Sequence, residues 1–239
     1  MKQSSGADET RISLGERSVR LRIIRQPRAK RLSIRIDAAT AEPVLILPPR
    51  ASLKSGLKFI DTHAEWIAEK LQALPVGQPF EPGAVIPFRG APHLLVHSGK
   101  VRDATRTEGQ TIVTGGDATA FARRIEDFLR AEARARALDR TAYYGAMLRR
   151  KAARVSIKDT KSRWGSCTPD RVLSFSWRLV LAPEPVFDYV IAHECAHMRE
   201  LNHGPRFWAL VEKIDPSYQA HRRWLDMEGA TLHAYGRSA

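Results

Sequence analysis

Apolar and polar residues alternate with a period of two in two segments near the start of the chain, residues 19–23 and 32–36, and a short apolar run at residues 44–47, stopped by Pro48 and Pro49, predicts a third strand. This alternation is typical of strands that bury one face, and arginines occupy several of the opposite positions in the first two segments. Over residues 52–74, apolar residues instead recur every three or four positions, which predicts one amphipathic helix. The Gly- and Pro-rich segment 76–117 contains only short apolar runs, which predict hairpins.

The second half of the chain begins with a long helical pattern. Residues 118–150 place apolar side chains on one side of a predicted helix and leave an arginine-rich face on the other. Strands are predicted at residues 155–157 and 173–179, where the alternation returns. Pro183 and Pro185 mark the start of another helix, because proline favours the first helical turn.

The charge of the chain is strongly basic and unevenly distributed. Lys and Arg number 39 against 26 Asp and Glu, a formal net charge of +13. Residues 1–36 hold 10 basic and 3 acidic residues (+7), and residues 118–163 hold 13 and 5 (+8). A field of this sign attracts anions, so non-specific contact with nucleic acid through these two segments is a hypothesis to test.

Cysteine usage and hydropathy indicate the compartment. Two cysteines, Cys167 and Cys195, are too few for a disulfide framework, and we interpret both as structural thiols in a reducing environment. No apolar run approaches the roughly 18 residues of a membrane helix, so we expect no membrane association. The chain is predicted to be cytoplasmic.

The strongest chemical signal is the pentad His193-Glu194-Cys195-Ala196-His197. HExxH on a helix places two imidazoles on one face, close enough to share a metal ion. The glutamate beside the ion is positioned to take a proton from metal-bound water and pass it to a leaving group. Zinc fits best, because it accepts nitrogen ligands and leaves a fourth position for water, whose pKa then falls to about 7. The prediction is one zinc ion with Glu194 as general base.

A catalytic zinc ion needs a third protein ligand, and His203 is the first candidate. An unbroken helix would carry His203 about 15 Å beyond His193, so the chain must turn near residues 199–202. Gly204, followed by proline, supplies turn chemistry there. The alternatives are Glu212 and Glu228 on later helices.

Several stretches together resemble the YgjP-like zinc metallopeptidase family, a relative of the SprT-like proteases. They are KSRWGSC (161–167), LSFSWRLVLAP (173–183), YVIAHECAHMRELNHGPRFW (189–208) and Asp215-Pro216. One departure is Ser176, where similar proteins often have asparagine.

The resemblance implies an α+β fold with a zincin-like catalytic half, in which the HExxH helix lies beside a small sheet. We accordingly expect a basic, β-rich N-terminal region over residues 1–117 and a metallohydrolase region over residues 118–239, which includes the long basic helix. The resemblance also implies that His193, His197 and His203 are the metal ligands and that Glu194 is the catalytic base.

Charged and aromatic residues near these motifs are candidate substrate contacts. The set comprises Arg163, Trp164, Arg178 and Arg206, and Lys161 would join it if the substrate were a polyanion.

Three reactions remain open for one metal site. Peptide-bond hydrolysis is favoured, with Tyr189, His221 or an arginine as oxyanion donor. Hydrolysis of a nucleoside triphosphate to a monophosphate is an activity also attached to YgjP-like proteins, and basic residues would then hold the phosphates. Similarity to the SprT-like branch suggests a DNA-associated protease. A purely structural zinc domain fits poorly, since it would usually take four ligands and would not need Glu194.

Overall fold

The structure is a computed structural model that describes residues 8–15, 17–37, 40, 42–72, 77–160 and 163–237. The chain forms two units, Met1–Val76 and Gly77–Ala239, each with its own apolar core. We expected the division after residue 117. It falls earlier because the hairpin strands between residues 85 and 114 bury Phe88, Leu95 and Ile112 in the same core as the long helix that follows them.

The first unit contains a mixed sheet of four strands, in the order β1-β2-β4-β3. The strands are β1 (Asp8–Leu14), β2 (Arg17–Arg25), β3 (Ser33–Asp37) and β4 (Glu42–Leu47). β2 and β4 are parallel, whereas β1 and β3 run antiparallel to their neighbours. The sequence pattern predicts three of these strands but not β1.

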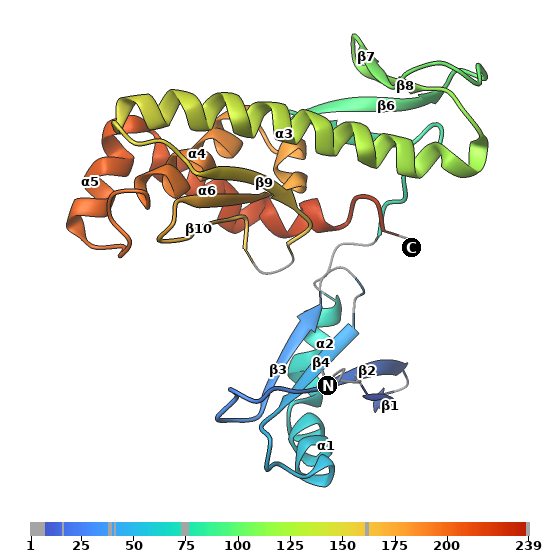
Figure 1. Ribbon diagram of the computed structural model, residues 1–239. Coiled ribbons are helices and arrows are strands. Elements are labelled where there is room, and N and C mark those ends of the chain that lie inside the picture. Colours follow the sequence, from blue (N-terminus) through green and yellow to red (C-terminus); the bar gives the residue numbers. More distant parts are fainter. Residues whose placement is uncertain are drawn as a thin grey trace, which may run out of the picture. The chain divides into compact units, whose positions relative to one another are not determined.

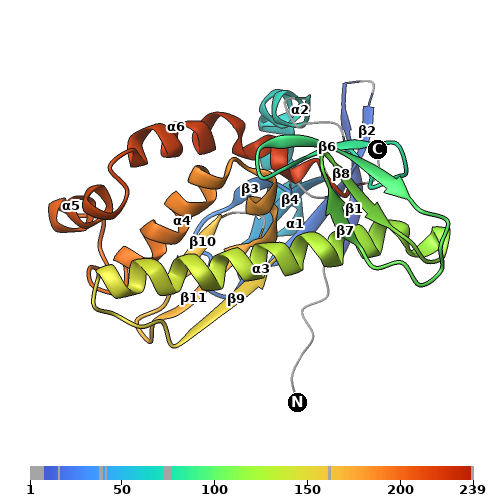
Figure 2. The same cartoon turned by 90° about the horizontal axis from the view of Figure 1, so that it is seen from above.

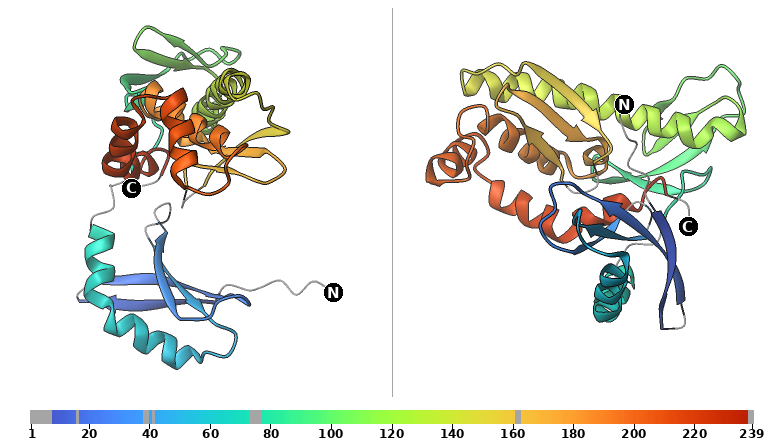
Figure 3. Two further views of the ribbon diagram at one scale, coloured as in Figure 1. Left: turned by 90° about the vertical axis from the view of Figure 1, so that its left-hand side faces the viewer. Right: turned by 60° about the horizontal axis from the view of Figure 1, so that its bottom comes forward.

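Two helices cover one face of this sheet, α1 (Leu53–Thr62) and α2 (Ala64–Gln72) (Figure 3). Ser52 caps α1 by accepting a hydrogen bond from the Ser55 amide at 3.1 Å. The single helix that we expected over residues 52–74 is interrupted at His63, whose ring bonds to the carbonyl of Phe59 at 2.8 Å. The apolar faces of both helices still pack into one core, so the spacing of apolar residues correctly predicted which side of the segment is buried.

The second unit contains two small sheets joined by a long helix. The first has the order β5-β6-β8-β7 and the second β10-β11-β9. The strands are β5 (Val85–Phe88), β6 (Ala91–His97), β7 (Arg106–Glu108), β8 (Thr111–Thr114), β9 (Arg154–Lys158), β10 (Gly165–Cys167) and β11 (Val172–Ser176). Helix α3 (Phe121–Met147) runs past both sheets (Figure 2).

Three further helices follow, of which the first packs against α3 and the second sheet and the other two pack against that first helix (Figure 1). They are α4 (Glu184–Ala196), α5 (Pro205–Ile214) and α6 (Tyr218–Glu228). The strand that we expected over residues 173–179 ends at Ser176 and continues as a buried 3₁₀ helix, Trp177–Leu181. None of the described helices combines the length and the apolar character that a membrane span requires.

Ion pairs hold the N-terminal turn of α4 against α3. Arg136 bonds to Glu184 at 2.7 Å and to Asp188 at 2.9 Å, and Arg140 also reaches Asp188 at 2.9 Å. Glu184 lies in the first turn of α4, where the positive end of the helix dipole stabilises its charge further, whereas Asp188 lies in the next turn. Part of the basic character of α3 is therefore neutralised inside the fold. The observed architecture is the α+β class that the sequence predicted.

Candidate metal centre

The end of α4 positions three residues of the HExxH motif. His193 and Glu194 lie in the last turn of the helix, and His197 is its C-cap residue. The amides of Met198 and Glu200 then bond to the carbonyls of Cys195 and Ala196, which closes the turn. The chain reverses before α5 begins at Pro205, as the sequence required if His203 was to return to the motif.

Three imidazole nitrogens converge after this turn. The Nε2 atom of His203 lies 3.0 Å from Nε2 of His193 and 3.1 Å from Nε2 of His197. Tetrahedral zinc with Zn–N bonds of about 2.0–2.1 Å would separate its ligand nitrogens by about 3.4 Å. The histidines therefore fit such an ion with only a small outward adjustment. Within the described part of the chain, no other group of three or more His, Cys, Asp or Glu side chains is arranged to hold a metal.

The alternative ligands do not approach this group. Glu212 and Glu228 are both exposed, and neither belongs to the cluster.

The surroundings favour the neutral form of His193 and His197 and fix the orientation of the His197 ring. Burial lowers the pKa of His193 to about 3, and burial also lowers the pKa of His197. The Nδ1 atom of His197 bonds to the carbonyl of Glu200 at 3.0 Å, so its proton resides there and Nε2 keeps a free lone pair. The ring of Phe207 packs against the cluster, and its centroid lies 4.4–4.8 Å from those of all three imidazoles. Neutral imidazoles with convergent lone pairs are the form that binds a metal.

The carboxylate of Glu194 packs directly against strand β10. A Cβ atom built on Gly165 would lie 2.6 Å from Oε1 of Glu194, closer than real contacts allow. Burial raises the pKa of Glu194 to about 8, and the positive charge of Arg163 opposes that rise. Such a carboxyl group is mostly protonated at neutral pH, and a cation held by the adjacent histidines would lower its pKa toward the ionised form that a general base needs.

Replacing Gly165 with alanine should lower the hydrolytic rate about 10- to 100-fold, since the added methyl group must push the Glu194 carboxylate from its place. Metal content should stay at the wild-type level, because the histidines are untouched. The matched control is Gly204→Ala, beside His203, where a Cβ atom meets nothing within 4 Å. Steady-state kinetics on both variants test this, and equal rates for the two would contradict it.

Two cavities flank His193 and Glu194 and share Gly165 as well. The first, about 330 Å³, lies toward the other two histidines and is also lined by Ser166, Cys167 and Leu201. The second, about 230 Å³, is also lined by Arg163, Trp164, Tyr189, Val190 and Leu225. The structure thus places two of the four candidate substrate contacts, Arg163 and Trp164, beside the metal centre.

Trp164, which lines the second cavity, is held in place by residues near the C-terminal end of the second unit. Its ring stacks on His233 at 4.9 Å between centroids, and Gly229 leaves the space that the indole fills. His233 itself is a buried residue. Leu225 and His233 had no recognisable motif, and only the fold brings them here.

The other two candidate contacts lie away from both cavities. Arg178 is buried, and its guanidinium donates to the carbonyls of Leu232 and Tyr235 and pairs with Asp159 at 3.2 Å. Arg206 is exposed on α5. Lys161 lies outside the described residues. The contacts of Arg178 tie the end of the chain to the core, which is a structural role.

Removing Arg178 should therefore affect stability rather than chemistry. We expect Arg178→Met to lower the free energy of unfolding by about 3 kcal/mol, because two carbonyls and a carboxylate lose a buried partner. Arg206→Met, at an exposed position, should change it by less than about 0.5 kcal/mol. Chemical denaturation compares the two. A stable Arg178→Met protein with weakened substrate binding would reverse this assignment.

The two cysteines are free thiols in different surroundings. Cys195 is buried, Cys167 is half-buried, and burial raises the pKa of both, to about 12 and about 11. Neither thiol ionises near neutral pH, and neither joins the histidine cluster.

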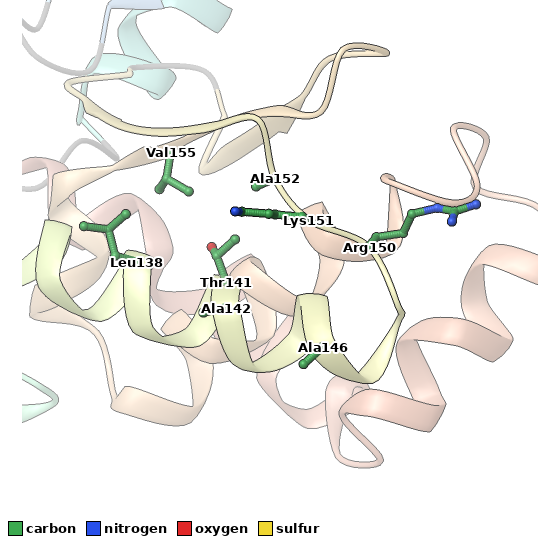
Figure 4. A pocket seen from close by; sticks show the side chains of 8 residues that line it. All are labelled: Leu138, Thr141, Ala142, Ala146, Arg150, Lys151, Ala152 and Val155. Atoms are coloured by element: carbon green, nitrogen blue, oxygen red, sulfur yellow. The ribbon is translucent and has the colours of Figure 1, made fainter.

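A larger pocket, about 450 Å³, lies between α3 and β9 (Figure 4). Five of its eight lining side chains are apolar, namely Leu138, Ala142, Ala146, Ala152 and Val155. The three polar ones are Thr141, Arg150 and Lys151. It holds no side chain of the kind that binds a metal or acts as a base near neutral pH. The chemistry therefore belongs to the smaller cavities over the histidines.

A known family and a solved structure are similar to this chain. A family model described as "YgjP-like, metallopeptidase domain" matches residues 30–228. The chain is also similar to the crystal structure of the metallopeptidase zymogen of Pyrococcus abyssi abylysin, with 19% identity over 38% of this chain and 93% of that chain and a TM-score of 0.35. A comparison with curated proteins found no match. The family model spans most of the chain and all the residues of the metal centre, and the chain therefore belongs to the YgjP-like family of metallopeptidase-domain proteins.

Proposed function

We propose that this protein is a zinc-dependent peptidase in which Glu194 is the general base. The observation that supports it most is the convergence of three histidine Nε2 atoms beside the buried carboxylate of Glu194, all lining one cavity. A zinc ion held by His193, His197 and His203 would supply Lewis acidity, polarising the scissile carbonyl and lowering the pKa of water to about 7.

Glu194 moves the proton in this mechanism. Its carboxylate accepts a proton from the attacking water and returns it to the departing amine. Close packing on Gly165 keeps the carboxylate in one place, so little motion is needed before transfer.

Strand β10 offers a place for an extended peptide. It stands at the edge of the sheet β10-β11-β9 and pairs on one side with β11. All three of its residues line the cavity next to the histidines. Peptides commonly bind by adding a strand to such an edge, where main-chain hydrogen bonds hold them regardless of side chain. This edge favours a polypeptide substrate.

Of Tyr189 and His221, the two side chains considered as hydrogen-bond donors to the oxyanion, Tyr189 is the better placed. It lines the second cavity, and its ring meets that of His193 at 5.9 Å between centroids. Burial raises its pKa to about 12, so the hydroxyl keeps the proton that it would donate. The other candidate, His221, is held by Asp215 at 2.9 Å.

The cations around the site favour a peptide over a nucleoside triphosphate. A triphosphate would need several positive side chains converging on the metal. Among the described basic residues that we considered as phosphate ligands, Arg163 lines a cavity beside the histidines. Arg178 instead donates to the carbonyl of Leu232.

The test is to incubate the zinc-loaded protein with an unfolded protein and with mixed nucleoside triphosphates, and to identify products by mass spectrometry. We expect new peptides, their loss after chelation of the metal, and their return when zinc is restored. Monophosphate plus pyrophosphate without peptides would overturn the proposal in favour of a pyrophosphatase.

A further inference from the structure

Two segments of the N-terminal unit carry basic charges without acidic ones. Residues 17–36 contain eight Arg and Lys and no Asp or Glu, and residues 43–60 contain three and none. Residues 17–58 also contain no aromatic side chain. The metal centre uses neither segment.

The fold brings parts of both segments to one end of the sheet. Because β2 and β4 are parallel, their C-terminal ends meet, and Arg25 is paired with Leu47. The loop after β2 returns beside the same place, since Ser33 is paired with Ile46. The guanidinium of Arg25 joins the two connections by donating to the carbonyl of Ala51 at 2.9 Å. Loop 26–32 and the start of α1 therefore lie together.

Six cations gather at this end of the sheet. We call them the basic edge, and they are Arg25, Arg28, Lys30, Arg31, Arg50 and Lys54. All six are exposed, and none forms an ion pair with an acid among the described residues. Farther along the sheet the situation differs, because Arg20 pairs with Glu9 and Glu42. The edge is thus a concentrated charge that the rest of the unit leaves uncompensated.

Helix α1 adds to this field. It begins at Leu53, has no acidic residue in its first turn, and points the positive end of its dipole toward the edge.

We propose that the basic edge binds the phosphate backbone of a nucleic-acid duplex. Four of the six cations are arginines, whose planar guanidinium matches phosphate oxygens in a bidentate manner. Single strands are held largely by stacking on aromatic side chains, which residues 17–58 do not provide. A membrane surface is less suited, because Leu53 is the large apolar side chain exposed here, whereas interfacial helices insert an apolar face.

The contact would be independent of sequence. Backbone phosphates carry no base information, and the edge presents cations rather than a helix or ribbon shaped for a groove. The edge would tether the protein to a duplex through its phosphates.

The test is fluorescence anisotropy of the full chain with a labelled DNA duplex and an RNA duplex of about 20 base pairs, titrated from about 50 to 200 mM salt. The logarithm of the association constant should fall linearly with that of salt, with a slope near −0.9 for each phosphate neutralised. The triple variant Arg28→Glu, Lys30→Glu, Arg31→Glu should weaken binding at least tenfold and reduce the slope by about 3. Comparison of the two duplexes distinguishes DNA from RNA.

The matched control carries the same change of charge on the other unit: Arg134→Glu, Arg150→Glu, Lys151→Glu, all exposed. It should keep affinity within about threefold of wild type at 200 mM salt, where distant charges are screened. An equal loss of duplex affinity in both variants would overturn the proposal, because it would show only a general attraction of the positively charged chain to nucleic acid. Tighter binding to polyglutamate, or to vesicles of phosphatidylcholine and phosphatidylserine, would also overturn it. Circular dichroism confirms that both variants fold.

Discussion

Glu194→Gln should lower kcat/KM for peptide hydrolysis by about 10²- to 10⁴-fold while the protein keeps its fold and its metal, the range that general-base catalysis contributes. Glutamine has the size of glutamate and fits the slot over Gly165, but its amide cannot accept the proton of the attacking water. Kinetics on an unfolded protein substrate, with metal content measured on the same samples, would check this result.

The matched control for this variant is Glu212→Gln, which makes the same change of charge at an exposed position on α5. It should have wild-type kinetics. If Glu194→Gln retained a tenth or more of the wild-type rate with full metal content, Glu194 would not be the group that moves the proton.

His203→Ala should weaken zinc binding by on the order of 100-fold or more. Structural zinc sites gain about 10–16 kcal/mol from four ligands, so one ligand is worth about 3 kcal/mol. The pair His193 and His197 would remain, but the nitrogen that lies 3.0–3.1 Å from both would be gone. Competition with a chromophoric chelator measures the affinity directly.

His221→Ala is the control for that experiment, because His221 bonds to Asp215 rather than to the cluster. We expect it to bind zinc as the wild type does. Unchanged affinity in His203→Ala would mean that another group completes the site, and the assignment of the third ligand would have to be revised.

The metal centre was predictable because its determinants are local. His193 and His197 share a face through the helical period alone. The return of His203 depended on a turn whose residues, Asn202 and Gly204, stand in the sequence beside it. The structure places all three together as that pattern predicted.

The parts that sequence analysis missed depend on packing between distant segments. Residues 173–179 alternate like a strand with one exposed face. In the structure Trp177 and Arg178 belong instead to a 3₁₀ helix in which every residue is buried, so the alternation does not mark an exposed face there. The division after residue 76 follows from which hairpins share a core with α3, which local pattern does not encode. Arg178 was interpreted as a candidate substrate contact because its actual partners lie 54 and 57 positions away and leave no local signal.

The spacing of the ligands has a consequence for folding. His193 and His203 are only ten positions apart, so closing the loop between them costs little entropy even in an unfolded chain. Denatured protein should consequently retain some affinity for zinc, and the ion will protect the native state by less than its native affinity suggests. The contact of Gly165 with Glu194 spans 29 positions (194 − 165) and forms only when β10 docks on α4. Bound zinc would therefore be a poor proxy for a correctly assembled catalytic site, and refolding is better followed by the return of hydrolysis.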